Sequence, residues 1–170
     1  MDLSLIIPCY NEEDNLVALS QKLYDLKNKY SFELVLVDNG STDNTNNIIN
    51  DLFFNIQETK IITVPENIGY GNGIIQGIEA STKNIIGWTH ADLQTPPEDI
   101  IKGFEIFINS KNNSTFVKGH RTKRRIVDLI FEYGMTIFAL LLTQKWMYDI
   151  NAQPTLFSRK HFLSWSNPPN

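Results

Sequence analysis

Cysteine is almost absent from this sequence, and other features that would mark a compartment are missing with it. Cys9 is the single cysteine among 170 residues, so no disulfide can form within the chain, and we expect a reducing, cytoplasmic location. Residues 1–4 lack the basic segment and apolar run of a secretory signal, so we expect no signal peptide. There is also no internal repeat and no low-complexity tract, which leaves an ordinary globular domain.

Long hydrophobic runs and an excess of basic charge are missing as well. No apolar segment reaches the roughly 18 residues that a membrane-spanning helix needs. The longest candidate, residues 126–142, is interrupted by Asp128 and Glu132. The net charge of −4 argues against broad nucleic-acid binding, which requires a basic surface, but it leaves room for a local phosphate site.

The residues that are present predict one α/β domain over 1–170. Hydrophobic residues make up 42% of the chain, enough for a packed core. Short apolar runs alternate with segments of helical periodicity, which indicates a Rossmann-like, mainly parallel sheet with helices on both faces. The expected strands are 3–7 (closed by Pro8), 32–37, 60–64, 84–89 and 115–118, and the expected helices are 12–27 (with an acidic first turn, 12–14), 41–53 (with Ser41 as N-cap), 69–81, 96–110 and 126–142.

Polar clusters follow four of the expected strands. They are residues 10–11, 38–41, 67–73 and 90–94. Ligands of such folds bind outside the carboxyl ends of the strands. Turns use the same polar residues, so one cluster alone would carry little weight. Four clusters at one edge of the sheet predict a binding site.

Asp38, at the end of the second strand, is the first candidate ligand-binding residue. A carboxylate there can accept hydrogen bonds from a ribose or a base N–H. Dinucleotide folds use the same position, but they require G-x-G-x-x-G after the first strand, and residues 8–12 contain no glycine. The Gly69-x-Gly71-x-Gly73 run follows a later strand and lacks the full pattern, so NAD is disfavoured.

The second candidate is the segment Thr89-His90-Ala91-Asp92-Leu93-Gln94. Carboxylate and amide oxygens suit Mg²⁺ or Mn²⁺, which can bridge the oxygens of a diphosphate and neutralise a leaving nucleoside diphosphate. Alternatively, Asp92 caps the following helix, but Glu98 and Asp99 already occupy its first turn.

Taken together, the sequence blocks resemble family 2 glycosyltransferases of the GT-A fold. The resemblance rests on residues 5–13 (LIIPCYNEE), 37–43 (VDNGSTD), Asn67-x-Gly69 and 91–98 (ADLQTPPE), and it covers residues 3–160. The last block is most similar to the branch of dolichol- and polyprenol-phosphate mannosyl- and glucosyltransferases.

The resemblance implies a role for each residue of a donor site. His90 departs from the family pattern, which usually has an acidic residue there, so metal affinity is in question; His90 is alternatively a plain strand-end histidine. The implied base, ribose and donor contacts are Pro8, Tyr10, Glu12, Asp38, Asn67, Gly69 and His90, and the implied metal ligands are Asp92 and Gln94.

The basic run 119–125 stands out in an acidic protein. It could be a solvated surface, but the resemblance places Arg121 on a donor or acceptor phosphate, to which arginine pairs well. Lys123, Arg124 and Arg125 could face anionic lipid. The following residues 126–142 form either an interfacial helix beside a membrane or a plain core helix.

Asp149 is implied to lie near the acceptor. A hydroxyl acceptor needs a carboxylate base to take its proton. A lipid phosphate is already largely ionised, with a second pKa of about 6, so Asp149 would then only orient groups.

These observations predict an inverting, metal-dependent transfer of a sugar from a nucleotide-diphosphate sugar to a polyprenyl phosphate or a cell-surface glycan precursor. Asp92, Asp149 and Arg121 are the expected catalytic residues. The protein would be cytoplasmic and peripheral at a membrane. A nucleotidyltransferase is disfavoured because the first loop lacks glycine, and the rival class is a non-catalytic or truncated nucleotide-sugar-binding module.

Overall fold

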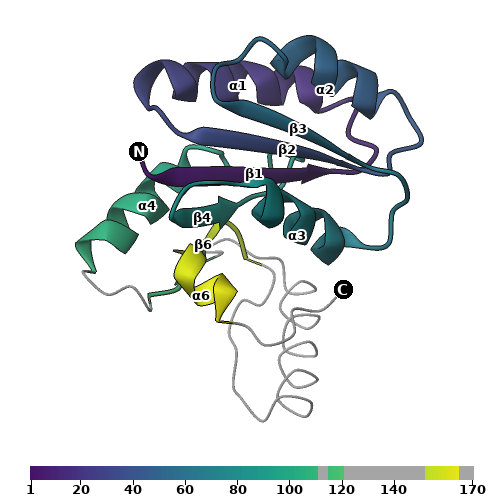
Figure 1. Ribbon diagram of the computed structural model, residues 1–170. Helices are drawn as coiled ribbons and strands as arrows, with labels where there is room; N and C mark the ends of the chain where they lie inside the picture. Colours follow the sequence, from purple (N-terminus) through teal and green to yellow (C-terminus); the bar gives the residue numbers. More distant parts are fainter. Residues whose placement is uncertain (111–114, 121–151, 165–170) are drawn as a thin grey trace, which may run out of the picture.

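The computed structural model describes residues 1–110, 115–120 and 152–164, which form a mixed six-stranded sheet flanked by helices (Figure 1). The sheet order is β3-β2-β1-β4-β6-β5. Strands β1, β2, β3 and β4 are mutually parallel, and β6 runs antiparallel to β4 and β5. The predicted α/β class is therefore confirmed. The strands are β1 (Leu3–Cys9), β2 (Glu33–Asn39), β3 (Thr59–Val64), β4 (Ile85–Trp88), β5 (Val117–Lys118) and β6 (Thr155–Ser158), and the helices are α1 (Leu16–Lys29), α2 (Thr45–Phe53), α3 (Tyr70–Ala80), α4 (Asp99–Asn109) and α6 (Arg159–Leu163).

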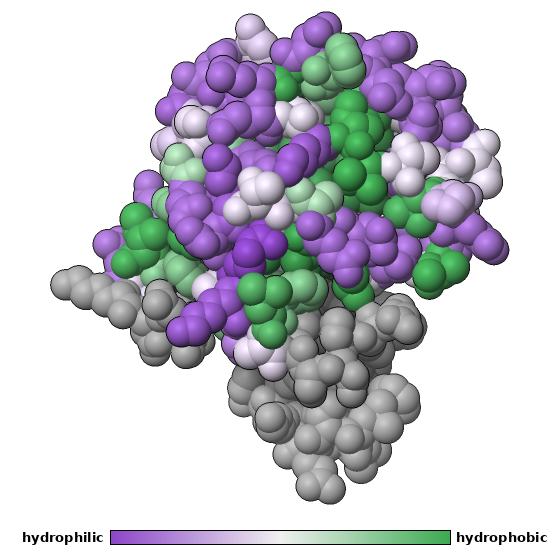
Figure 2. Space-filling model, in the orientation of Figure 1, coloured by the Kyte–Doolittle hydropathy of each residue, from purple (hydrophilic) through white to green (hydrophobic). Residues whose placement is uncertain are grey.

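Alternate side chains of the central strands build two cores, one on each face of the sheet. Leu3, Leu5 and Ile7 of β1 pack with buried residues of α1, α2 and α4. Ile6 packs on the opposite face with Ile78 of α3. Hydrophilic side chains cover most of the visible surface outside these layers (Figure 2). None of the helices in the described part of the chain is long and apolar enough to cross a bilayer.

Several element boundaries differ from the sequence expectation, and two of the differences lie at helix starts. Helix α1 begins at Leu16, so residues 12–14 precede it and do not form its first turn. Helix α2 begins at Thr45 with Asn44 in the cap position, so Ser41 is not its N-cap. In both cases the polar side chains before the helix bond to a neighbouring loop, as described below.

Pro8 does not close β1 but lies within it. The carbonyl of Ile6 accepts a hydrogen bond from the amide of Thr89, so the backbone polar groups of Ile6 face β4. Pro8 lies two residues further along β1, so its backbone nitrogen also faces the β4 side, but β4 has already ended at Trp88. The missing N–H of the proline therefore costs no ladder bond, and the strand continues by pairing with Val37 of β2.

Gly77 lets α3 approach β1 and β2 closely. A β-carbon at this position would collide with the side chain of Ile6 and lie 3.1 Å from Cγ2 of Val37. The glycine therefore sets the distance between α3 and the sheet, and with it the position of the first residue of α3, Tyr70.

Glu33 joins three strands at the edge of the sheet opposite the polar loops. Its carboxylate, 4% exposed, accepts hydrogen bonds from Ser4 and Thr82 and an ion pair at 3.0 Å from Lys60. Burial raises the pKa of Glu33, but the bonds from Ser4, Thr82 and Lys60 outweigh burial and lower the pKa to about 2.

We predict that Gly77→Ala destabilises the protein by about 1–3 kcal/mol, because the added methyl group overpacks the α3–sheet contact. Gly71→Ala is the matched control in the same helix, since a β-carbon there meets nothing within 4 Å. Alanine at position 71 should leave stability unchanged or raise it by up to about 1 kcal/mol through helix propensity. Urea unfolding of both variants measures the difference, and equal effects would contradict the close-packing interpretation.

We predict that Glu33→Gln lowers the free energy of unfolding at neutral pH by about 2–3 kcal/mol. The folded-state pKa lies below the ordinary value of 4.5, so the contribution of Glu33 is full above pH 4.5 and is lost as pH falls toward about 2. The variant should therefore show a shallower loss of stability across that window. Glu105→Gln, on the exposed face of α4, is the control and should unfold like the wild type at every pH.

Candidate functional site

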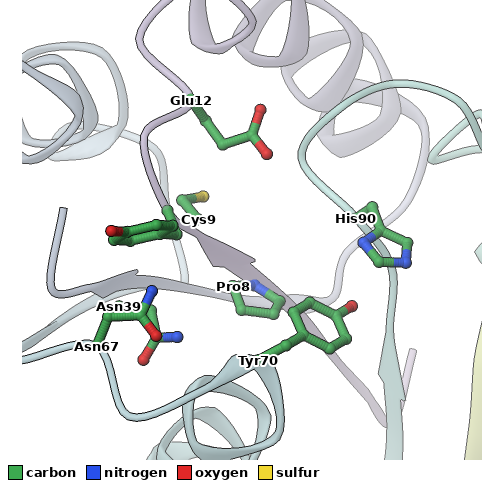
Figure 3. Close-up of a pocket in the computed structure, with 8 residues that line it drawn as sticks. Pro8, Cys9, Glu12, Asn39, Asn67, Tyr70 and His90 are labelled. Atoms are coloured by element: carbon green, nitrogen blue, oxygen red, sulfur yellow. The ribbon is translucent and has the colours of Figure 1, made fainter. Parts of the chain in front are cut away.

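A pocket of about 220 Å³ lies at the carboxyl edge of the parallel strands (Figure 3). Ligand pockets usually occupy about 300–1,000 Å³, so this pocket accommodates only part of a large ligand. Five residues predicted from the sequence line it together: Pro8, Tyr10, Glu12, Asn67 and His90. The structure adds Cys9, Asn39 and Tyr70, of which Asn39 and Tyr70 had not been singled out.

Two loops that form this edge are joined by reciprocal hydrogen bonds. Asn11, in the left-handed region with φ 54°, accepts a bond at 2.9 Å from the amide of Thr42 and donates its own amide to Oγ of Ser41 at 3.1 Å. The amide of Glu12 donates to Oγ1 of Thr45 at 2.8 Å. We call this set of bonds between residues 11–13 and 41–45 the loop clasp; its other members are the bonds from Glu13 to Asp43 and from Asn44 to Glu13.

Asp38 lies outside the pocket lining. It is 2% exposed, and its Oδ1 accepts the amide of Ser41 at 3.0 Å while its Oδ2 accepts Nδ2 of Asn46 at 2.7 Å. Asn46 in turn donates to Oγ1 of Thr63. Asp38 therefore ties the end of β2 to α2 and β3, and its contact with a base or ribose stays a prediction.

Asn39 presents a buried acceptor to the pocket. Asn39 is 2% exposed, and its Nδ2 donates a hydrogen bond to the carbonyl oxygen of Gly69 at 3.0 Å. No residue in the described part of the chain donates a hydrogen bond to Oδ1 of Asn39. Leaving such an acceptor unpaired costs about 1–3 kcal/mol, which a ligand N–H would recover. The signal that could have identified Asn39 from the sequence is its position directly after Asp38, at the end of the second strand.

Tyr70 and His90 stack against each other in the pocket. Their ring centroids are 4.9 Å apart and the ring planes differ by 13°. Burial, and then the negative charge of Asp92, raise the pKa of the Tyr70 hydroxyl, which therefore stays protonated. Burial likewise raises the pKa of the Cys9 thiol, as expected for a packing residue and not for a nucleophile.

The loop after β4 carries the predicted metal ligands outside the pocket lining. Oδ1 of Asp92 accepts the amide of Gln94 at 3.0 Å across Leu93, whose φ is 59°, while no described residue donates to Oδ2. Gln94 is exposed. Among the described residues there is no group of three or more His, Cys, Asp or Glu side chains that could hold a metal ion.

Gly69 contributes through its backbone conformation at this edge of the sheet. Gly69 precedes α3 with φ 123°, a conformation that favours glycine, and its amide donates to Oδ1 of Asn67 at 2.8 Å. Arg121, Asp149 and the segment 121–142 lie outside the described residues.

Comparisons with known proteins bear on the family and the fold. An uncharacterized glycosyltransferase of Synechocystis is 32% identical over 135 residues, covering 72% of this chain and 42% of its own length. A dolichol-phosphate mannosyltransferase of Pyrococcus furiosus is 31% identical over 126 residues, covering 72% of this chain and 36% of its own. A mannosyltransferase from Pyrobaculum calidifontis, solved with GDP-Man and Mn²⁺, has the same fold, with a TM-score of 0.68 at 17% identity over 96% of this chain and 46% of that one.

The chain thus spans less than half the length of the curated relatives just described. The family model described as glycosyl transferase family 2 matches residues 4–166, nearly all of the chain. The pocket at the carboxyl edge of the sheet is lined by residues of the sequence blocks that carry the resemblance, among them Pro8, Tyr10, Glu12 and Asn67. This chain belongs to glycosyl transferase family 2.

Proposed function

We propose that this chain is the donor-binding domain of an inverting glycosyltransferase. It would transfer a sugar from a nucleoside-diphosphate sugar to a polyprenyl phosphate or a glycan precursor. The observation that carries the proposal is the pocket itself, because residues from the ends of β1, β2 and β4 and the start of α3 converge there, where open α/β folds bind nucleotides. A pocket of about 220 Å³ suits the nucleoside, with the diphosphate directed toward the loop after β4.

Asn39 supports a nucleobase or ribose in the pocket. Its unpaired Oδ1 is a fixed acceptor, because Nδ2 is already held by the Gly69 carbonyl. A base N–H or a ribose hydroxyl can donate to it. Tyr10, which is exposed at the mouth of the pocket, offers an aromatic face for the ring.

The residues of the β4 loop fit a divalent cation that is held jointly with a diphosphate. No described residue donates to one of the two carboxylate oxygens of Asp92, and Gln94 adds an amide oxygen. Mg²⁺ is commonly held by one or two carboxylates together with substrate phosphates and water. When bound, the cation would neutralise charge on the departing nucleoside diphosphate.

The other reaction roles rest on residues outside the described part of the chain. Arg121 would pair with a phosphate, and Asp149 would serve as the base for a hydroxyl acceptor or orient a lipid phosphate. The relatives include a dolichol-phosphate mannosyltransferase, which supports a lipid-phosphate acceptor. Residues 121–142 would then lie against the cytoplasmic face of a membrane.

A non-catalytic nucleotide-sugar-binding module is the second candidate. The observation that favours it is His90, because it leaves Asp92 as the single carboxylate of the loop 89–97. Binding of nucleotide sugars without either transfer or slow donor hydrolysis would support this alternative.

We predict that UDP, GDP or TDP, as the free diphosphate or the sugar nucleotide, raises the melting temperature, and that Mn²⁺ enlarges the shift. Asp92→Ala should abolish the Mn²⁺-dependent part of the shift and reduce sugar transfer or donor hydrolysis by about 100-fold or more. Asp51→Ala, on the exposed side of α2, is the carboxylate control and should behave as the wild type. A full Mn²⁺-dependent shift in Asp92→Ala would refute the metal assignment.

We also predict that Asn39→Ala weakens nucleoside-diphosphate binding by about tenfold, the effect of losing one buried hydrogen bond. Asn47→Ala, in α2 and away from the pocket lining, should bind normally. Isothermal titration calorimetry measures both affinities, and circular dichroism verifies that the variants are folded. Equal affinities in the two variants would remove Asn39 from the nucleotide site.

A further inference from the structure

We propose that Tyr70 is a positioning residue whose ring fixes the His90 imidazole in the pocket, so that an N–H of His90 donates to an oxygen of the bound nucleoside diphosphate. This inference rests on the proposed function and assigns a specific task to two of the pocket residues. Neither task follows from the metal ligands or from the loop clasp.

The two rings come from elements that are distant in sequence. Tyr70 is the first residue of α3, and His90 follows β4. With 4.9 Å between centroids and 13° between planes, the two rings are nearly parallel and stacked. Figure 3 shows them next to each other in the pocket. Aromatic stacking of this kind restricts the rotation of a side chain about its own torsions.

The stack leaves the edge of the imidazole available. Stacking uses the face of the ring, whereas both nitrogens of histidine lie on its edge. No described residue forms a hydrogen bond with the ring nitrogens of His90, so its ring contact with Tyr70 is the interaction that orients it. A neutral imidazole carries one N–H donor and one acceptor, which suits an oxygen-rich ligand.

Tyr70 is the better fixed of the two residues. The carbonyl of Gly69, directly before it, is held by Nδ2 of Asn39, and α3 is seated on the sheet at Gly77. The Tyr70 hydroxyl has no hydrogen-bond partner among the described residues, so the ring and not the hydroxyl makes the contact. Phenylalanine should therefore replace tyrosine without loss, while leucine should not.

The loop after β4 places little negative charge beside this pair, whereas Glu12 is the acidic side chain among the described residues that line the pocket. Between residues 89 and 97, Asp92 is the single acidic side chain. A histidine in place of a second carboxylate removes one negative charge that would repel a diphosphate. Fixing the ring before binding also avoids ordering it when the ligand arrives, which improves affinity.

The test measures UDP and GDP binding by calorimetry in the intact chain and in Tyr70→Phe, Tyr70→Leu, His90→Ala and the double variant Tyr70→Leu/His90→Ala. We expect Tyr70→Phe to bind within twofold of the wild type. Tyr70→Leu and His90→Ala should each lose about fivefold to tenfold. The double variant should bind no more weakly than His90→Ala, because Tyr70 acts through His90.

A spectroscopic signature accompanies the affinities. The ring protons of His90, assigned by their loss in His90→Ala, should move downfield in Tyr70→Leu and stay in place in Tyr70→Phe. Unchanged His90 signals in Tyr70→Leu, independent losses that multiply in the double variant, or unaltered binding by His90→Ala would each overturn the inference. If the wild type binds neither nucleotide, the donor site fails with it, whereas binding with independent losses defeats only the Tyr70–His90 pairing.

Discussion

The loop clasp is the constraint on which the site depends. Parallel strands deliver their polar loops to one edge, but they do not fix how those loops lie against each other. Here Asn11 and Glu12 exchange hydrogen bonds with Ser41, Thr42 and Thr45, so the loop after β1 and the loop before α2 form one unit. Tyr10 and Glu12 take their places in the pocket wall from the same unit. Backbone amides at this edge are thereby satisfied by side chains of the neighbouring loop, which leaves the pocket lining to the ligand.

The strands and helices from β1 to β5 were predictable from the sequence because periodicity and burial are local signals, whereas β6 and α6 were not predicted. The leucines at 16, 19, 23 and 26 are all buried on one side of α1, as their spacing predicts. Residues 12–14 and Ser41 were misplaced because the same acidic and hydroxyl side chains suit a helix start and a loop-to-loop bond equally well. Only the tertiary pairing decides between these uses. Asn39 and Tyr70 were missed for a related reason, since the direction of a side chain at a strand end or helix start depends on its neighbours.

The balance of charge at this edge links the fold to its proposed chemistry. Both carboxylate oxygens of Asp38 accept hydrogen bonds, from its own loop and from α2, whereas no described residue donates to Oδ2 of Asp92. Asp38, near the end of β2, and Asp92, in the loop after β4, therefore serve different purposes on the two sides of β1. With one carboxylate in the loop after β4, the described residues alone offer a weak cation site, so cation and diphosphate would bind most favourably together. Binding of the donor would then be strongly cooperative with metal.

Pro8 has a further consequence for the crevice above β1 and β4. Parallel strands tend to extend their pairing wherever a donor faces an acceptor, and the next bond toward β4 would come from residue 8. Because proline has no N–H, further pairing of the chain after Trp88 with β1 would lack the bond donated by residue 8. The two strands part at this point, and the loop carrying His90 turns away from the sheet. A single imino acid thus favours the end of strand pairing at Trp88, which leaves room for a ligand between the two strand ends.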